Sequence, residues 1–192
     1  MKYIVKWIII RQFHNVKQQM AKRKIIRLTI TLTIAGLLIY YFYPENKLQN
    51  NVQIDNIIVC KSKREMSVYS NGELLKTYKI SLGRQPLGRK EFEGDKKTPE
   101  GIYSINDKNH NSGYHKNLGI SYPGKNDIEN AKQFGKSAGG DIKIHGFRNG
   151  IGFVGKFHRW FDWTLGCIAV TNQEIDELYD TVKIGTRIEI KP

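Results

Sequence analysis

Cysteine is scarce in this sequence, with only Cys60 and Cys167 among 192 residues. So few cysteines exclude a scaffold held together by many disulfides in place of a core. The histidines and cysteines also lack the short ligand spacings that are typical of zinc sites. A single Cys60–Cys167 disulfide remains open from the sequence alone. Against it, Cys60 lies in the apolar run NIIVC, the usual setting of a small buried thiol.

Acidic residues are absent from residues 1–27, which contain eight lysines and arginines. Removing these eight charges from the formal +13 of the whole chain leaves +5 for the remainder. The basic character is therefore mainly a property of the N-terminus. A nucleic-acid-binding domain would carry its basic residues on the folded surface, so we expect no nucleic-acid partner.

Charge of either sign is absent from Leu28 to Tyr43. With Ile25 and Ile26 this gives 19 nearly apolar residues, interrupted only by Arg27, which is close to the roughly 20 needed to span a bilayer. Positive charges precede the run and tyrosines end it. The pattern predicts a cytoplasmic N-terminus at residues 1–24 and a single-pass anchor in the cytoplasmic (inner) membrane at 25–43. The rest of the chain would then lie on the periplasmic or extracellular side.

Small residues in an Ala-x-Ala arrangement are missing after the apolar run, where the chain reads YPENKLQ. Their absence favours an uncleaved signal anchor over the alternative, a cleaved signal peptide. Met20, followed by AKRK, would also serve as the start of such a segment. Residues 44–55 are polar and lack an apolar period, so we expect a linker there and one folded domain at 56–192.

The exported part contains short β-like runs and little helical periodicity. Asn71-Gly72 separates two of these runs and predicts a type I′ hairpin turn, because both residues tolerate positive φ. Helices are expected at 127–134 and after Thr171, where Glu174 completes a capping box. We therefore expect a mainly β domain, a sandwich or barrel with one or two peripheral helices. The expected strands are 57–60, 66–70, 74–83, 101–105, 118–122, 141–145, 167–170 and 187–190.

Cys167 and His145 are the candidate nucleophile and base. Cys167 follows Gly166 at the start of an apolar strand, where a glycine permits a sharp turn that directs backbone N–H groups toward one point. His145 ends the run DIKIH, and alternation places it on the face opposite Ile144. If the two strand ends are neighbours, the imidazole can deprotonate the thiol for covalent acyl transfer.

Other histidines offer alternatives to this assignment. His158 lies in the aromatic segment GFVGKFHRWFDWT, which resembles a lid, and is a rival base. His110 and His115 lie in the polar stretch NDKNHNSGYHKN and are expected to be exposed. A structural role for either Cys167 or His145 would be the ordinary interpretation if each stood alone.

The pattern around these two residues resembles the L,D-transpeptidase catalytic domain, also called the YkuD domain. That family's signature is a His, a gap, and then Ser/Thr-His-Gly-Cys. Here it is matched by His145 with Gly146 and by Thr164-Leu165-Gly166-Cys167. Two positions depart from the signature, because Leu165 replaces its second His and Ala169 replaces an Asn. Supporting stretches are KISLGRQPLGRKEFEGDKKTPEGIYSI, LGISYP, GGDIKIHG and DWTLGCIAVTNQEIDELY, which follow one another between residues 79 and 179. The resemblance as a whole extends over about residues 57–190.

The resemblance implies a cysteine acyltransferase that acts on peptidoglycan stem peptides during cell-wall remodelling and needs no cofactor. Cys167 would form a thioester at the third residue of the stem, and His145 would be the base, oriented by the carbonyl of Gly146. Backbone N–H groups at Gly166 and Cys167, with Leu165 as a further candidate, would bind the oxyanion. An amine acceptor would complete transpeptidation. If water took its place, the enzyme would be an L,D-carboxypeptidase or a murein peptide hydrolase.

Residues near the motif supply candidate substrate contacts. Arg148 and Arg159 could bind the carboxylates of acidic stem peptides, although a solvated basic loop would have the same composition. Trp163 and Leu165 flank the nucleophile and are further candidates, with a core position as the alternative for Trp163. A non-catalytic wall-binding module is the third class of function, suggested by the basic aromatic segment and the missing second His.

Overall fold

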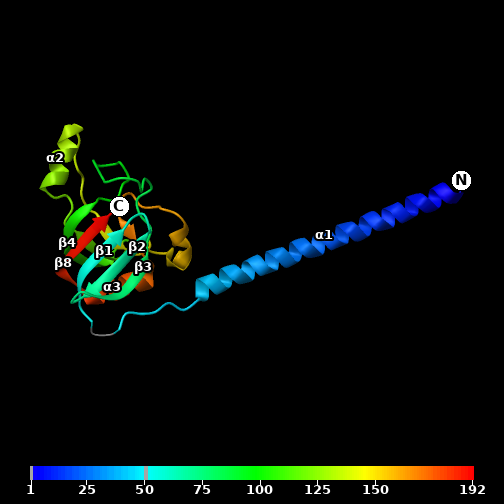
Figure 1. The fold of residues 1–192 in the computed structure, drawn as a ribbon, viewed down its shortest axis with the longest axis horizontal. Coiled ribbons are helices and arrows are strands. Elements are labelled where there is room, and N and C mark those ends of the chain that lie inside the picture. Colours follow the sequence, from blue (N-terminus) through cyan, green and yellow to red (C-terminus); the bar gives the residue numbers. More distant parts are fainter. Residues whose placement is uncertain (1, 50–51) are drawn as a thin grey trace. The chain divides into compact units, whose positions relative to one another are not determined.

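The protein is described by a computed structural model that covers residues 2–49 and 52–192. The chain divides into two compact units, Met1–Glu45 and Asn46–Pro192. In Figure 1 the first unit is one long helix, and the second is a folded domain built on a β-sheet. The predicted linker at 44–55 includes residues 50 and 51, which lie outside the described residues, and the first strand already begins at Ile54.

The N-terminal unit is the helix α1 (Lys2–Phe42). Its stretch Phe13–Phe42 is the one helix among the described residues that is long and apolar enough to cross a membrane. A signal sequence near the N-terminus shares these properties. The hydroxyls of Thr29, Thr31 and Thr33 donate to carbonyls four residues earlier, so their polar groups are satisfied within the helix. This helix contains the predicted anchor at 25–43 except for its last residue, Tyr43.

The second unit is built on one eight-stranded sheet in the order β3-β2-β1-β8-β4-β5-β6-β7. Most neighbours are antiparallel, whereas β1 with β8 and β6 with β7 are parallel pairs. Figure 1 shows the C-terminal strand β8 among the first strands of the domain. The strands are β1 (Ile54–Cys60), β2 (Glu65–Ser70), β3 (Glu73–Lys79), β4 (Gly101–Ser112), β5 (His115–Ile120), β6 (Lys143–His145), β7 (Ile168–Ala169) and β8 (Val182–Lys191). The mainly β fold predicted from the sequence is confirmed, as a half-barrel sheet.

The local signals in the sequence correspond to observed features. Asn71 and Gly72 have φ of 50° and 82°, as the type I′ turn between β2 and β3 requires. The helix α3 (Asn172–Thr181) begins at the Thr171 cap, and Thr171 and Glu174 form both bonds of the capping box. The other predicted helix is α2 (Lys125–Gln133).

Several expectations were wrong in extent or type. The strand predicted at 74–83 ends at Lys79, and the one predicted at 187–190 begins at Val182. The strand predicted at 141–145 is only β6, because Asp141 has a φ of 59°, outside the β region. Strands β4 and β5 extend much closer to the tip of their hairpin than predicted. The aromatic segment expected to be a loop forms the 3-10 helix η1 (Gly152–Trp160), interrupted at Gly155, which has a φ of 50°.

Among the described residues, the buried hydrophobic core lies in the second unit. Its buried members extend from Ile54 to Ile190 and come from the strands, α2, α3 and the segments between them. Isoleucine and valine predominate, and these β-branched side chains suit a pleated surface. Because the core is complete within this unit, residues 46–192 have what an independently folding domain requires.

Candidate active site

The parallel pairing of β6 and β7 brings the two candidate catalytic residues together. Ile144 pairs with Ile168, and His145 pairs with Ala169. Both isoleucines are fully buried, so they define the core face of this pair. Side chains alternate along a strand, which places His145 and Cys167 together on the opposite face. They are diagonal neighbours across two adjacent strands.

Gly166 fixes the turn that leads into Cys167. Its φ is 138°, a conformation that residues with a side chain rarely adopt. A Cβ at this position would lie 2.8 Å from the carbonyl oxygen of Lys97. The backbone segments at Gly83 and Gly166 also pack closely, since a Cβ on Gly83 would lie 3.1 Å from the Gly166 Cα. Only glycine fits this crowded position.

Thr164 closes the same turn with its hydroxyl. Its Oγ1 accepts a hydrogen bond from the Gly166 N–H at 3.1 Å and donates to the Cys167 carbonyl at 2.7 Å. The Gly166 N–H is therefore already engaged, contrary to the expectation that it would serve as an oxyanion donor. The glycine contributes through backbone conformation, because that conformation directs the peptide of Cys167.

His145 is 6% exposed, and its ring is held on several sides. Its Nδ1 lies 2.6 Å from the carbonyl oxygen of Gly146, the contact that the resemblance implied. A carbonyl can only accept, which assigns the proton to Nδ1 and leaves Nε2 with a lone pair. The Tyr114 ring lies 4.7 Å from the imidazole and the Trp163 ring 5.7 Å, measured between centroids. Burial lowers the pKa of His145, partly opposed by the bond to Gly146.

The Cys167 thiol donates to the carbonyl of Asp141, with a sulfur-to-oxygen distance of 3.6 Å. Burial raises its pKa above that of an ordinary thiol, the Lys143 backbone partly opposes this, and the Asp141 carboxylate adds to it. The raised pKa of the Cys167 thiol and the lowered pKa of the His145 imidazole both favour the neutral forms of the two groups. Both cysteines of the chain are free thiols. Because the Cys167 thiol bonds to the Asp141 carbonyl, transfer of its proton to His145 requires the thiol to turn from that carbonyl toward Nε2.

The four residues predicted to contact the substrate differ in exposure and in bonding partners. Arg148 is exposed, and Leu165 is 67% exposed beside the nucleophile. Arg159 instead forms a 2.7 Å ion pair with Glu174, and both side chains are almost fully buried. Because Glu174 also caps α3, Arg159 ties η1 to that helix, and the guanidinium predicted to bind a substrate carboxylate is paired with a carboxylate of the protein itself. Trp163 stacks on Phe147 at 6.0 Å, and its Nε1 is buried without a hydrogen-bond partner among the described residues.

His158, the rival candidate for the base, is buried and bonded to the sheet. It is 1% exposed, and its Nδ1 lies 2.9 Å from Ser81 Oγ. Ser81 in turn exchanges two backbone hydrogen bonds with Ala169. His158 therefore joins η1 to the sheet. His115 was expected to be exposed, but its Nε2 pairs with Asp176 of α3 at 2.9 Å.

The sequence did not identify two residues that lie beside His145. Tyr114, at the tip of the β4–β5 hairpin, packs on the His145 ring. Asn117 on β5 lies opposite His145 in the strand register. Neither belongs to a motif, and both lie in the polar stretch NDKNHNSGYHKN, so only strand pairing could have identified them.

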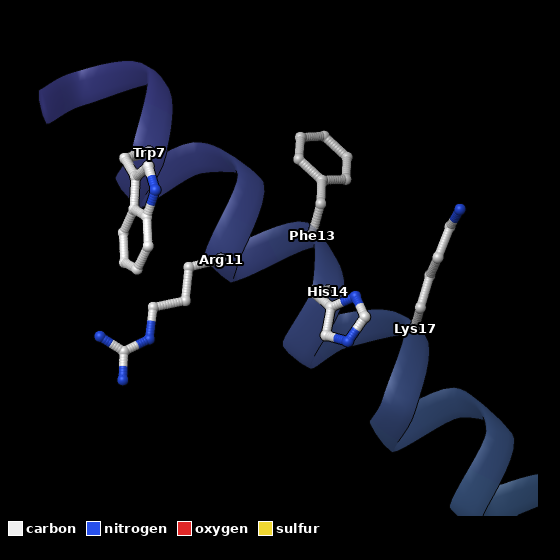
Figure 2. Close-up of a pocket in the computed structure, with 5 residues that line it drawn as sticks. All are labelled: Trp7, Arg11, Phe13, His14 and Lys17. Carbon is white, nitrogen blue, oxygen red and sulfur yellow. The ribbon is translucent and has the colours of Figure 1, made fainter. Parts of the chain in front are cut away.

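A separate hollow occurs on α1, lined by Trp7, Arg11, Phe13, His14 and Lys17. In Figure 2 Trp7 and Arg11 project to one side of the helix, and Phe13 and Lys17 to another. All five lining side chains come from α1 itself. Among the described residues, no group of three or more histidine, cysteine, aspartate or glutamate side chains is arranged to hold a metal ion.

Comparison with known proteins identifies relatives of this domain. The family model for the L,D-transpeptidase catalytic domain, YkuD, matches residues 55–190. "Putative L,D-transpeptidase YafK" of Escherichia coli K12 is 32% identical over 132 residues, which cover 66% of this chain and 46% of that protein. "Putative L,D-transpeptidase YqjB" of Bacillus subtilis is 30% identical over 137 residues, covering 70% and 69%.

A solved structure agrees with these sequence matches. The helical cell shape determining protein Pgp2 of Campylobacter jejuni aligns with a TM-score of 0.53 and 25% identity, covering 76% of this chain and 51% of that one. The chain thus spans about half the length of YafK and of Pgp2. With the family model matched across nearly the whole second unit, the chain belongs to the L,D-transpeptidase catalytic domain (YkuD) family.

Proposed function

We propose that this chain is a membrane-anchored L,D-transpeptidase that remodels peptidoglycan through a thioester at Cys167. The observation that carries the proposal is the placement of His145 and Cys167 on one face of the parallel β6–β7 pair. The bond from His145 Nδ1 to the Gly146 carbonyl leaves Nε2 as the basic nitrogen on that face. Nucleophile, base and base-orienting acceptor are then provided by two strand ends.

The reaction proceeds in two acyl transfers. Nε2 of His145 takes the thiol proton, and the Cys167 sulfur attacks the carbonyl of the third residue of a stem peptide. The C–N bond to the terminal D-residue breaks, and the leaving amine takes the proton from His145. An acceptor amine then attacks the thioester and passes its proton to His145. The thiolate leaves and is protonated again, which restores the resting pair.

The Cys167 backbone N–H is the oxyanion donor that this geometry favours. Gly166 orients the peptide unit, while its own N–H is held by Thr164. A backbone donor fixed by a crowded turn needs no reorganisation as charge develops on the carbonyl oxygen. Leu165 and Trp163 add apolar surface beside the nucleophile, which is suited to excluding water from the thioester.

The helix α1 supplies the proposed membrane anchor, with the second unit outside the cytoplasm. Its apolar stretch and the basic residues before it support this orientation. Pgp2, whose name describes it as determining helical cell shape, supports a role in wall remodelling. Protease added to intact spheroplasts should digest residues 46–192 and spare the N-terminal residues. Protection of the domain would reverse the topology.

The test of the chemistry is a mass measurement. Incubation of the protein with a carbapenem should add the mass of the drug to Cys167, as family membership implies. The variant Cys167→Ala should remain unmodified, and the matched control Cys60→Ala should react like the parent. An unmodified Cys167 in folded protein would overturn the nucleophile assignment. Muropeptide digests then separate the reactions, since new cross-linked dimers show transfer, whereas shortened monomers show hydrolysis.

A further inference from the structure

Asn117 occupies a special position relative to the proposed base. Strands β5 and β6 pair Asn117 with His145 and Leu118 with Ile144. The Ile120 N–H donates to the Ile142 carbonyl, and the Gly146 N–H to the Lys116 carbonyl. The residue pairs Lys116–Gly146 and Ile120–Ile142 are therefore hydrogen-bonded pairs. Such pairs alternate along an antiparallel ladder, so Asn117 and His145 form a non-hydrogen-bonded pair. In such pairs the two side chains share a face and approach most closely.

The side chain of Asn117 is buried and only half satisfied. It is 4% exposed, and its Nδ2 donates to Ser112 Oγ at 2.8 Å. Its Oδ1 is also buried and has no hydrogen-bond partner among the described residues. Whichever way the amide is turned, one end meets Ser112 and the other remains on the face that carries His145. A buried polar group without a partner calls for an explanation in function.

Ser112 connects this amide to the ring that covers the base. Its Oγ accepts a second bond from the Tyr114 N–H at 3.0 Å. The same turn is held by Asn149, whose N–H donates to the Gly113 carbonyl and whose Nδ2 donates to the Ser112 carbonyl. The Tyr114 ring then lies 4.7 Å from the imidazole. Asn117 thus bonds to the turn through Ser112, and the strand register places it on the same face as the imidazole.

We propose that Asn117 is a positioning residue for His145, holding the Tyr114 turn against the imidazole and presenting its second amide atom to the same face. This inference rests on the proposed role of His145 as the base. In this role Asn117 influences the orientation and the protonation of the imidazole, and it does not contact the reacting atoms.

Other titratable groups surround His145 and must remain unchanged in any test. Of these, Lys143 is a cause of the shift in the pKa of His145. The groups on the elements packed around it are Tyr114 at the hairpin tip, His115 and Lys116 on β5, Asp141 and Lys143 at β6, Cys167 before β7 and Asp176 on α3.

The decisive variant is Asn117→Asp in the full chain, with the rate of acylation of Cys167 by a carbapenem measured across pH. A carboxylate beside the imidazole stabilises its protonated form, so the acidic limb of the profile should move up by about 1 pH unit. Asn111→Asp is the matched control, because it makes the same charge change at an exposed position of the same hairpin. It should leave the limb in place. An unmoved limb in Asn117→Asp, or an equal shift in both variants, overturns the proposal.

A second variant covers the case in which Asn117→Asp does not fold. Asn117→Ser removes the amide at little steric cost. Alkylation of Cys167 by iodoacetamide should be about tenfold slower than in the parent near pH 7, where the thiol needs the base. The two rates should converge at a pH where the thiolate forms without help. A constant deficit at every pH, or equal rates throughout, contradicts a role through His145.

His145→Ala separates the two levels of inference. If this variant is acylated as fast as the parent, the proposed base is wrong and the proposed function fails. If it is slowed while both Asn117 variants behave like the parent, only the inference about Asn117 fails.

Discussion

Substituting Gly166 by alanine tests whether the turn before the nucleophile is fixed by sterics. The new Cβ would lie 2.8 Å from the Lys97 carbonyl oxygen, and the backbone φ of 138° is strained for any side chain. Strain of this kind costs about 1–3 kcal/mol. Forcing an atom into a packed site costs about another 1–3 kcal/mol. We expect Gly166→Ala to lower the free energy of unfolding by about 4 kcal/mol, the sum of both costs.

Gly150→Ala separates the two contributions. Gly150 has a φ of 90°, but a Cβ there would meet no atom within 4 Å. It should therefore show only the backbone cost, about 2 kcal/mol. Urea unfolding of residues 46–192, followed by tryptophan fluorescence, measures both variants. Equal losses in the two would refute the steric account of Gly166.

The same substitution should impair chemistry in the fraction that remains folded. A shift of the Gly166 backbone displaces the peptide of Cys167, and a displacement of about 1 Å can cost about 100-fold in rate. Carbapenem acylation of Gly166→Ala should fall by at least that factor, whereas Gly150→Ala should react like the parent. Parent-like acylation of folded Gly166→Ala would show that the turn does not set the reactive geometry.

Three further outcomes are expected. The rate of alkylation of Cys167 should rise with pH around a midpoint above the pKa of an ordinary thiol, because burial raises the pKa of Cys167. Peptide mapping after alkylation at a series of pH values measures this midpoint. A midpoint below that of free cysteine would indicate a preformed ion pair. Asp95→Asn should cost about 3 kcal/mol at neutral pH by leaving the buried Lys90 unpaired. Burial raises the pKa of Asp95, but Lys90 and three backbone N–H groups together lower this pKa by more than burial raises it. The contribution of Asp95 to the free energy of unfolding is therefore complete above about pH 4 and disappears as acid protonates the carboxylate. The deficit of the variant should therefore shrink below pH 4 in urea unfolding, and a constant deficit would exclude this linkage. Arg159→Ala should cost about 3 kcal/mol in the same assay by removing the buried ion pair with Glu174, and a loss under about 1 kcal/mol would mean that the pair is solvated.

Much of the fold was determined by local sequence. Asn71 and Gly72 predict their turn because the I′ conformation needs positive φ at both positions. Thr171 and Glu174 predict the start of α3 because each satisfies a backbone N–H at the helix end. Each of the eight strands overlaps a segment predicted from short β-like runs, although several bounds differ. These features depend on neighbours within a few residues, so the chain encodes them without reference to its fold.

The candidate pair was also visible in the sequence. Gly166 before Cys167 and Gly146 after His145 are local features, and their order in the chain matches a family signature. The catalytic assignment itself remains a proposal that the adduct experiment tests. Strand alternation had placed His145 on the face away from Ile144, and the register of β6 with β7 shows that Cys167 shares that face.

Tertiary structure decided the partners of the polar side chains around the site. Arg159 resembles a substrate ligand in the sequence, but the fold buries it against Glu174. The Gly166 N–H resembles an oxyanion donor, but Thr164 occupies it. Asn117 carries no motif, and only the pairing of β5 with β6 brings it opposite His145. A sequence thus specifies which groups can donate, accept or carry charge. Which of them meet depends on strand register and on packing between segments far apart in the chain, and these are properties of the whole fold.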